Sequence, residues 1–133
     1  MKKYLLLSMA VISQLFIGCS EDDFENDLEN GDPTGKGYDV RYEASVSDTI
    51  NYLLRVGYVN QNGSVVQEDV KRPFVYNMTG KKRGDYLYIS VASHLKPHGT
   101  NTNNKVSCQL YVNDKLTKED SGEAAAVVNQ VLE

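Results

Sequence analysis

The residues best suited to metal chemistry in this chain are its two histidines, His94 and His98. Their spacing would place both imidazoles on one face of an α-helix, where they could hold a metal ion together. Pro97 lies between them and disfavours a helix, and no further ligand pattern accompanies the pair. We therefore expect two exposed polar residues where a strand runs into a loop, and we predict neither a metal site nor a cofactor.

Paired carboxylates are the next candidates for catalysis, and they occur as Glu68-Asp69 and Glu119-Asp120. Adjacent residues on a strand point to opposite faces, so neither pair can form a two-acid site by itself. The chain also lacks the motifs of serine hydrolases, zinc proteases, P-loop proteins and Gly-rich nucleotide-binding turns. We therefore predict that the protein is not an enzyme, and a small hydrolase with an unrecognised site is the alternative.

Tyrosine is the residue type that stands out, because the chain has nine tyrosines and no tryptophan. Three share the phase of the apolar residues around them and are predicted to be buried: Tyr42, Tyr52 and Tyr76. Three others lie on the opposite phase of their strands: Tyr86, Tyr88 and Tyr111. Exposed tyrosines suit contact with a glycan or a protein, whereas the alternative is ordinary cross-strand packing on the solvent face. If the strands over residues 86–95 and 105–113 pair, these three tyrosines form one aromatic patch.

The first cysteine, Cys19, follows a basic start and an apolar run, which is the pattern of a secretory signal peptide over residues 1–18. The run is too short to span a bilayer, since a transmembrane helix needs about 20 apolar residues. It ends in "FIGC", which resembles the lipobox of bacterial lipoproteins, where lipid is attached to the Cys and the chain is cut before it. This resemblance implies an anchor of acyl chains such as palmitate on Cys19, and each buried methylene would contribute about 0.8 kcal/mol.

The segment that follows Cys19 is strongly acidic, because residues 20–32 hold seven of the 18 Asp and Glu of the chain. Such a run cannot bury a core, so residues 19–37 are predicted to be a disordered, flexible tether with a reach of roughly 20 to 25 Å. A Ser followed by acids directly after a lipidated Cys resembles the surface-export signal of Bacteroidetes lipoproteins. We therefore expect a lipid-anchored outer-membrane protein on the cell surface, and the periplasmic face of the outer membrane is the alternative.

The charge of the chain belongs mainly to this acidic segment. The whole chain has a formal charge of −4, whereas residues 33–133 are almost neutral. A domain without an excess of basic residues lacks the positive surface that attracts the phosphates of nucleic acid. We therefore predict no nucleic-acid partner. The expected contacts are with the membrane, through lipid on Cys19, and with an unidentified envelope protein or glycan.

Alternation of apolar and polar residues dominates from residue 38 onward and predicts β-strands. The first predicted strand covers residues 38–46 and the second covers residues 49–59, with Ile50 on its apolar phase. Asn62-Gly63 and Asn113-Asp114 predict hairpins. Further strands are expected in five segments: 64–70, 72–79, 86–95, 105–113 and 115–120.

Two features of the C-terminal part leave alternatives. Cys108 lies on the apolar phase of its strand and is predicted to be a buried small hydrophobe, whereas a reactive thiol or an intermolecular bridge is the alternative. The last segment, 122–133, is ambiguous, because its alanines favour helix and its valines favour strand. We choose strand, since a last strand would complete an otherwise all-β pair of sheets.

Seven or eight short strands with turn signals between them define the expected fold class. They predict an all-β domain over residues 38–133, a small antiparallel β-sandwich of the immunoglobulin-like kind, after the acidic tether. A domain of this size buries little more than about 60% of its chain surface, which leaves little room for a deep pocket.

The order of short motifs over residues 40–128 resembles the soluble domain of the MmpS family, the small mycobacterial membrane proteins. The motifs are "VRYEAS", "INY", "KRPF", "VSCQLYVNDK" and "GEAAAVV". The resemblance implies a β-sandwich held at a membrane, which assists RND-type transporters in exporting lipids and siderophores. The chain departs from the family where Phe74 stands in place of a Trp, and where no second Cys is present to pair with Cys108.

These observations predict a non-enzymatic, lipid-anchored outer-membrane lipoprotein whose β-sandwich is a binding module at the cell envelope. The alternative is an accessory protein to an RND-type lipid or siderophore exporter, as the resemblance implies. Docking on a transporter predicts a contiguous exposed patch, whereas a glycan binder predicts its tyrosines in a shallow groove. An enzyme predicts titratable groups with perturbed pKa values that converge in a concave pocket.

Overall fold

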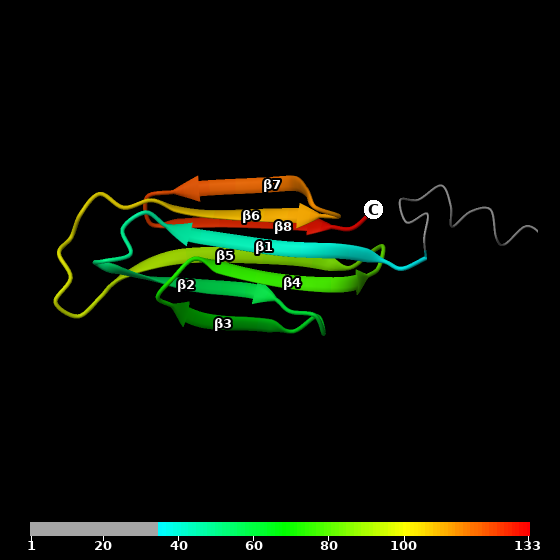
Figure 1. Cartoon of the computed structure of the whole chain (residues 1–133), viewed down its shortest axis with the longest axis horizontal. Coiled ribbons are helices and arrows are strands. Elements are labelled where there is room, and N and C mark those ends of the chain that lie inside the picture. The colour runs from blue at the N-terminus through cyan, green and yellow to red at the C-terminus, as the bar shows by residue number, and fades with distance from the viewer. Residues whose placement is uncertain (1–34) are drawn as a thin grey trace, which may run out of the picture.

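The computed structural model describes residues 35–133, which form eight β-strands and no helix (Figure 1). The strands are Tyr38–Val46 (β1), Tyr52–Val59 (β2), Val65–Val70 (β3), Phe74–Lys81 (β4), Tyr86–Leu95 (β5), Val106–Val112 (β6), Lys115–Gly122 (β7) and Ala125–Val131 (β8). The expected signal peptide, the expected lipidation site Cys19 and nearly all of the expected tether lie outside the described residues. Within residues 35–133, no helix is long and apolar enough to cross a membrane.

The strands build two four-stranded antiparallel sheets that pack face to face, so the predicted small β-sandwich is confirmed. One sheet has the order β4-β1-β6-β7 and the other has the order β3-β2-β5-β8. The β2–β3 and β6–β7 hairpins stay within one sheet, and the other connections cross between the sheets. The start of β1 and the C-terminus lie at one end of the sandwich, while the long connection between β5 and β6 lies at the opposite end (Figure 1).

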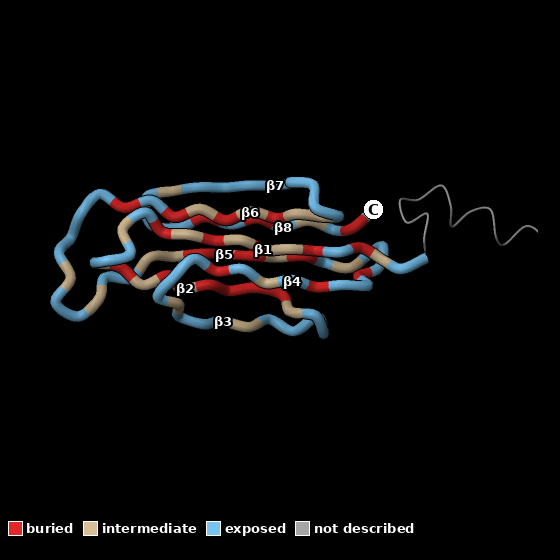
Figure 2. The backbone as a smooth tube through the Cα atoms, in the orientation of Figure 1, coloured by how far each residue is buried: buried red, intermediate tan, exposed pale blue. Residues whose placement is uncertain are grey.

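The hydrophobic core lies between the two sheets and is formed by every second side chain of the strands, because alternate residues of a strand point inward. In β1 every second residue of Tyr38–Val46 is buried, and in β5 the buried residues are Leu87, Ile89 and Val91. Figure 2 shows buried residues along the inner strands and mostly exposed residues along the edge strands β3 and β7. Full burial of a side chain such as Leu54 or Ile89 stabilises the fold by about 1.5–3 kcal/mol.

Aromatic side chains link the two sheets inside the core. The ring centroid of Tyr58 lies 4.7 Å from that of Tyr76 and 5.0 Å from that of Phe74. Contacts of this kind add about 0.5–1.5 kcal/mol beyond the buried area. Tyr42 of β1 is fully buried, and its hydroxyl accepts a hydrogen bond of 3.2 Å from the backbone N–H of Tyr88 in β5. This bond connects the core to the strand that carries two of the predicted site tyrosines.

The predicted start of the second strand is wrong. β2 begins at Tyr52, and Ile50, which we expected on the apolar phase, lies in the preceding turn with 82% of its surface exposed. The cause is the side chain of Asp48, which accepts hydrogen bonds from the backbone N–H groups of Ile50 and Asn51. Such a local bond offers the backbone an alternative to strand pairing, and alternation alone does not reveal it.

Asp48 should make the stability of the protein depend on pH in the acid range. Hydrogen bonds from the side chains of Asn51 and Thr102 lower the pKa of Asp48 from 3.8 to about 2. Because the folded-state pKa is the lower one, the stabilisation is present above about pH 4 and is lost as the pH falls toward about 2. We expect Asp48→Asn to be less stable at neutral pH and to lose less stability on acidification, as measured by urea unfolding at a series of pH values. Equal pH slopes in the two chains would contradict this role.

Two further predictions about the C-terminal half are confirmed. Asn113 and Asp114 form the turn of the β6–β7 hairpin, and both adopt positive φ, 50° and 62°. Two consecutive residues of positive φ give the tight turn whose twist matches that of the flanking strands. The ambiguous last segment contains the strand β8, with Ala126 and Val128 buried against the core.

Side chains protect the outer edges of β4 and β3. On β4, the side-chain amide of Gln61 donates to the carbonyl of Thr79 (2.9 Å) and accepts from its N–H (3.1 Å), as a neighbouring strand would. On β3, Glu68 shares the register of inward-facing Val56, so a charge occupies the phase that would otherwise be apolar. Satisfied backbone groups and inward-pointing charges both discourage an edge strand from pairing with another chain.

The edge of β8 is protected in the same way by residues of β7. The N–H of Val127 donates to the carboxylate of Asp120 (2.9 Å), and the carbonyl of Asn129 accepts from the ammonium of Lys118 (2.8 Å). These two bonds also join the two sheets along this side of the sandwich, because β7 and β8 belong to different sheets.

Cys108 is fully buried in β6, which confirms its expected place on the apolar phase. Burial, with a smaller contribution from the charge of Asp120, raises the pKa of the thiol to about 11. Since the thiolate is the reactive form, Cys108 in a Cys19→Ser chain should not react with a chromogenic thiol reagent until the protein is unfolded. After unfolding it should react once per chain. Rapid labelling of the folded chain would contradict the buried, inert thiol.

Candidate functional site

The outer face of the β4-β1-β6-β7 sheet is polar along its two central strands, β1 and β6. Arg41 forms an ion pair with Glu43 (2.8 Å), and the hydroxyls of Ser45 and Ser107 lie 2.9 Å apart. Tyr111 belongs to this face, and the guanidinium carbon of Arg41 lies 4.2 Å from its ring centroid. The cation–π contact covers part of the ring. Val75 of β4 and Leu116 of β7 are also exposed on this face, but they lie on its two edge strands, with β1 and β6 between them. The centre of the face therefore has the polar character expected for the solvated side of an antiparallel sheet.

The outer face of the β3-β2-β5-β8 sheet is different, because it carries a continuous set of large apolar side chains. We call this set the apolar strip, and its members are Val59, Val65, Tyr86, Tyr88, Val127 and Val131. Val65 is 73% exposed, and Tyr86, Val127 and Val131 are each close to half exposed. Tyr86 and Val131 are direct partners in the β5–β8 register, so their side chains are neighbours.

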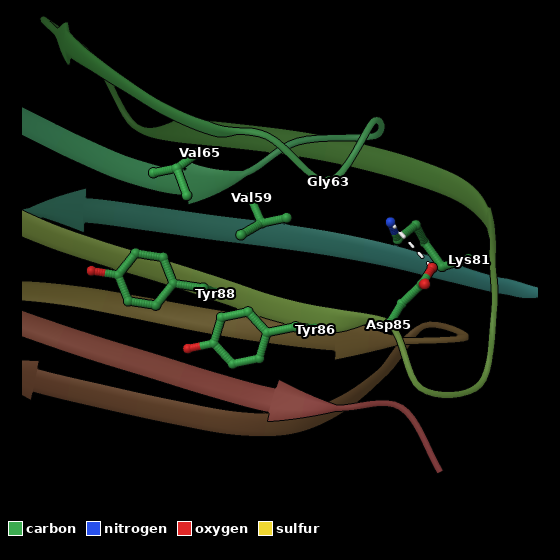
Figure 3. A pocket seen from close by; sticks show the side chains of 7 residues that line it. All are labelled: Val59, Gly63, Val65, Lys81, Asp85, Tyr86 and Tyr88. Atoms are coloured by element: carbon green, nitrogen blue, oxygen red, sulfur yellow. Dashed lines mark ion pairs between the residues drawn. The ribbon is translucent and has the colours of Figure 1, made fainter.

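An open depression of about 480 Å³ lies on the apolar strip beside the β4–β5 turn (Figure 3). The rings of Tyr86 and Tyr88 lie side by side along it, with 6.4 Å between their centroids and 20° between their planes. Valine side chains of β2 and β3 face these rings across the depression (Figure 3). Lys81 and Asp85 border its end, where the ammonium and carboxylate lie 3.2 Å apart. Because these two charges pair with each other, the depression offers mainly apolar surface.

The turn between β4 and β5 holds the start of the tyrosine pair in place. The carboxylate of Asp85 accepts a 2.9 Å hydrogen bond from the N–H of Lys82, which is the main reason why the pKa of Asp85 is lowered. The N–H of Gly84 donates to the carbonyl of Leu132, and the N–H of Leu132 donates to the carbonyl of Asp85. Tyr86 therefore follows a turn that is tied to the chain beyond β8, so its backbone is well positioned for contact.

A second open depression, of about 460 Å³, continues the face beyond Tyr88. Small residues contribute to its lining: Gly57, Ser90, Ala92 and Ala125. A Cβ at position 57 would lie 2.8 Å from the hydroxyl of Ser90, so a larger residue there would displace that hydroxyl. Arg55 and Asp69 form a bidentate ion pair beside it, at 2.7 and 2.9 Å. The face therefore combines an apolar centre with a polar rim, which is the usual anatomy of a protein interface.

The structure brings together two of the three tyrosines that the sequence pointed to. Tyr86 and Tyr88 line one depression, whereas Tyr111 lies on the outer face of the other sheet. The condition for one patch, that residues 86–95 pair with residues 105–113, is not met, because β5 pairs with β2 and β8 while β6 pairs with β1 and β7. A single patch of three tyrosines therefore does not form.

The aliphatic part of the apolar strip was not predicted from the sequence. In β8 the inward phase carries Ala126 and Val128, while Val127 and Val131 point outward. The outward phase of β8 is therefore at least as apolar as the inward phase, and this was the signal in the sequence that could have revealed the strip. The two histidines, His94 and His98, are both exposed. Within residues 35–133, no three His, Cys, Asp or Glu residues are grouped so that they could hold a metal ion.

No protein-family model matches this sequence, and no curated protein matches it. The fold and the site therefore define the class of protein: it is a small antiparallel β-sandwich, and one of its outer faces carries the apolar strip. Lipidation at Cys19 and the resemblance to the MmpS family stay predictions.

Proposed function

We propose that this chain is a non-enzymatic, lipid-anchored lipoprotein of the outer membrane and that its β-sandwich is a binding module at the cell envelope. Its contact face is the apolar strip, and its partner is an envelope protein. The observation that carries the proposal is the difference between the outer faces. One exposes Val75 and Leu116 only on its two edge strands, whereas the other exposes Val65, Tyr86, Val127 and Val131. Continuous exposed apolar surface of this kind marks interaction sites on soluble domains.

The chemistry of the strip favours a protein over a glycan. A sugar presents many hydroxyl groups that need hydrogen-bond partners, whereas Val65, Val127 and Val131 extend the surface with groups that form none. The charged groups at the end of the depression, Lys81 and Asp85, are paired with each other. A flat aromatic pair beside aliphatic side chains suits an apolar protein surface.

The titratable groups support a non-enzymatic role. Tyr42 and Tyr58, whose pKa values are raised to about 12 chiefly by burial, belong to the core, and so does Cys108. Asp69 and Asp85 have lowered pKa values because a basic side chain or a backbone N–H donates to each of them. In residues 35–133, packing and turn structure therefore account for these shifts without a catalytic constellation.

The position of the contact face favours a partner associated with the membrane. Tyr38, the first residue of β1, is the register partner of Lys81, which borders the depression. A lipid on Cys19 would hold this end of the sandwich toward the membrane, at the end of a tether with a reach of roughly 20 to 25 Å. This arrangement also supports the second candidate function, an accessory protein to an RND-type lipid or siderophore exporter, which the MmpS-like resemblance implies.

Site-specific photo-cross-linking in the cells that make the protein tests the contact face. A photoreactive phenylalanine analogue in place of Tyr86 should form an adduct with one envelope protein, which mass spectrometry would identify. The same analogue in place of Tyr111, on the opposite face, is the matched control and should give no such adduct. Equal adducts at both positions, or none at Tyr86, would contradict the proposed face.

The anchor is tested separately with the Cys19→Ser chain in the same cells. Without the thiol, the chain should fail to incorporate radiolabelled palmitate and should leave the membrane fraction. Palmitate labelling that persists in the variant would refute a lipid on Cys19, while leaving the contact face open to the cross-linking result.

A further inference from the structure

A polar pocket of about 700 Å³ is lined mainly by residues of connections between strands. These connections lie at the end of the sandwich opposite the start of β1 (Figure 1). It is formed by the connections that join β1 to β2, β5 to β6 and β7 to β8. We call it the loop-end pocket. None of the residues of the apolar strip lines it, so the two surfaces are separate.

Asn104 supplies a buried hydrogen-bond donor to this pocket. The residue is 7% exposed, and its Oδ1 lies 3.4 Å from the backbone N–H of Asp48 and 3.3 Å from the hydroxyl of Ser47. Because a backbone N–H can only donate, the amide oxygen must face Asp48, and this fixes the orientation of the amide. The Nδ2 group then has no hydrogen-bond partner among the described residues. A buried donor of this kind needs an acceptor, which a bound molecule or an ordered water can supply.

The loop that carries Asn104 is held in shape by hydrogen bonds to Tyr52 and Asp48, which lie outside the loop. The hydroxyl of Tyr52 lies 2.8 Å from Oδ1 of Asn101 and accepts the N–H of Thr102 at 3.1 Å. The hydroxyl of Thr102 in turn donates to the carboxylate of Asp48. A preformed loop lowers the ordering cost of binding, so the pocket can bind a ligand without first folding around it.

The lining of the loop-end pocket matches a neutral ligand that is rich in hydroxyl groups. Amide and hydroxyl side chains make up much of the wall: Ser47, Ser93, Asn101, Thr102, Asn103 and Asn104. Such groups both donate and accept hydrogen bonds, as the hydroxyls of a sugar do. One cation, Lys105, and one anion, Glu123, also border the pocket and offset each other. The carboxylate of Asp48, which accepts the hydrogen bond from Thr102, adds a negative charge next to the lining, so an anionic ligand would find no matching field.

We propose that the loop-end pocket binds a neutral saccharide and that Nδ2 of Asn104 donates to one of its oxygens. The volume lies within the range of about 300–1,000 Å³ that is usual for small-molecule sites. With the chain anchored at Cys19, as proposed above, this pocket lies at the end of the sandwich that is farther from the tether. The protein then has two contact surfaces, an apolar one at the membrane side for a protein and a polar one at the far end for a sugar.

A printed array of neutral and acidic oligosaccharides, probed with the full chain in detergent, tests the saccharide site. We expect binding to a neutral oligosaccharide, and calorimetry then gives its affinity. Asn104→Asp keeps Oδ1 but removes the donors, so it should weaken binding at least about tenfold. Ala124→Trp changes an exposed residue of the pocket wall and should weaken binding as much by filling the space, with no core residue altered.

Two control variants separate this proposal from the proposed function. Asn77→Asp makes the same chemical change at an exposed position of β4, and Tyr86→Ala alters the apolar strip; neither should change saccharide affinity. If the wild-type chain binds no neutral oligosaccharide, or if neither pocket variant weakens binding, the proposal is overturned and ordered water alone satisfies Asn104. Binding restricted to acidic oligosaccharides would overturn it as well.

Discussion

Replacing Tyr42 with alanine should lower the free energy of unfolding by about 3–5 kcal/mol, the usual cost of removing a large buried aromatic side chain. Tyr42 is fully buried in the core, and its ring centroid lies 6.4 Å from that of Tyr58 and 6.5 Å from that of Tyr76. The substitution leaves a cavity between the two sheets and removes contacts to both. Urea unfolding followed by far-ultraviolet circular dichroism measures the loss.

The Tyr42→Phe chain is the matched control, because it keeps the ring and removes only the hydroxyl. That hydroxyl accepts the N–H of Tyr88, and burial raises its pKa to about 12, so it stays protonated at neutral pH. Leaving the N–H without its partner should cost about 1–3 kcal/mol. A phenylalanine variant as stable as the wild type would show that this bond contributes nothing, and one as unstable as Tyr42→Ala would show that the ring contributes nothing.

Truncating Tyr86 to alanine should weaken binding of the envelope partner by about 30-fold or more, while changing the free energy of unfolding by less than about 1 kcal/mol. Tyr86 is half exposed, so its ring is not part of the core, yet it lies between Tyr88 and Val131 on the apolar strip. A large aromatic side chain at such a position is the kind of residue that dominates interface energetics. The affinity would be measured with the cross-linked partner after its purification.

The same truncation at Tyr111 is the control for the opposite face. Tyr111→Ala removes an equal side chain, together with its contact to Arg41, but lies on the polar outer face. We expect partner affinity to stay unchanged. If Tyr111→Ala weakens binding as much as Tyr86→Ala, the contact surface cannot be the apolar strip alone, and the proposed function would have to be revised.

The fold could be predicted because strand periodicity and turn chemistry are local. The alternation that defined the strands identified the buried residues of β1 and β5, and the Asn113-Asp114 turn, with positive φ at both residues, occurs where a hairpin was expected. Ile50 shows where this reasoning fails. Its apolar side chain fits the alternation, but hydrogen bonds to Asp48 turn the backbone there before the strand begins.

The site could be predicted only in part, because the assignment of strands to sheets is not local. Periodicity correctly put Tyr86, Tyr88 and Tyr111 on the non-core phase, but it gives no information about which strands become neighbours. The β5–β6 connection crosses between the sheets, so two tyrosines face one side of the sandwich and the third faces the other. Exposed Val127 was missed for a related reason, since a valine in a strand is usually counted toward the core.

The side-chain hydrogen bonds along the edges of β4 and β8 have a consequence for a protein that is anchored to a membrane, as proposed above. Molecules tethered to a lipid layer diffuse in two dimensions, and they meet edge to edge far more often than molecules in free solution. Gln61 on β4 and Asp120 with Lys118 on β8 occupy backbone groups through which such collisions could extend one sheet into the next. If the chain is anchored as proposed, neighbouring molecules should therefore not join through the edges of β4 and β8, and contacts on these sides would be made by side chains.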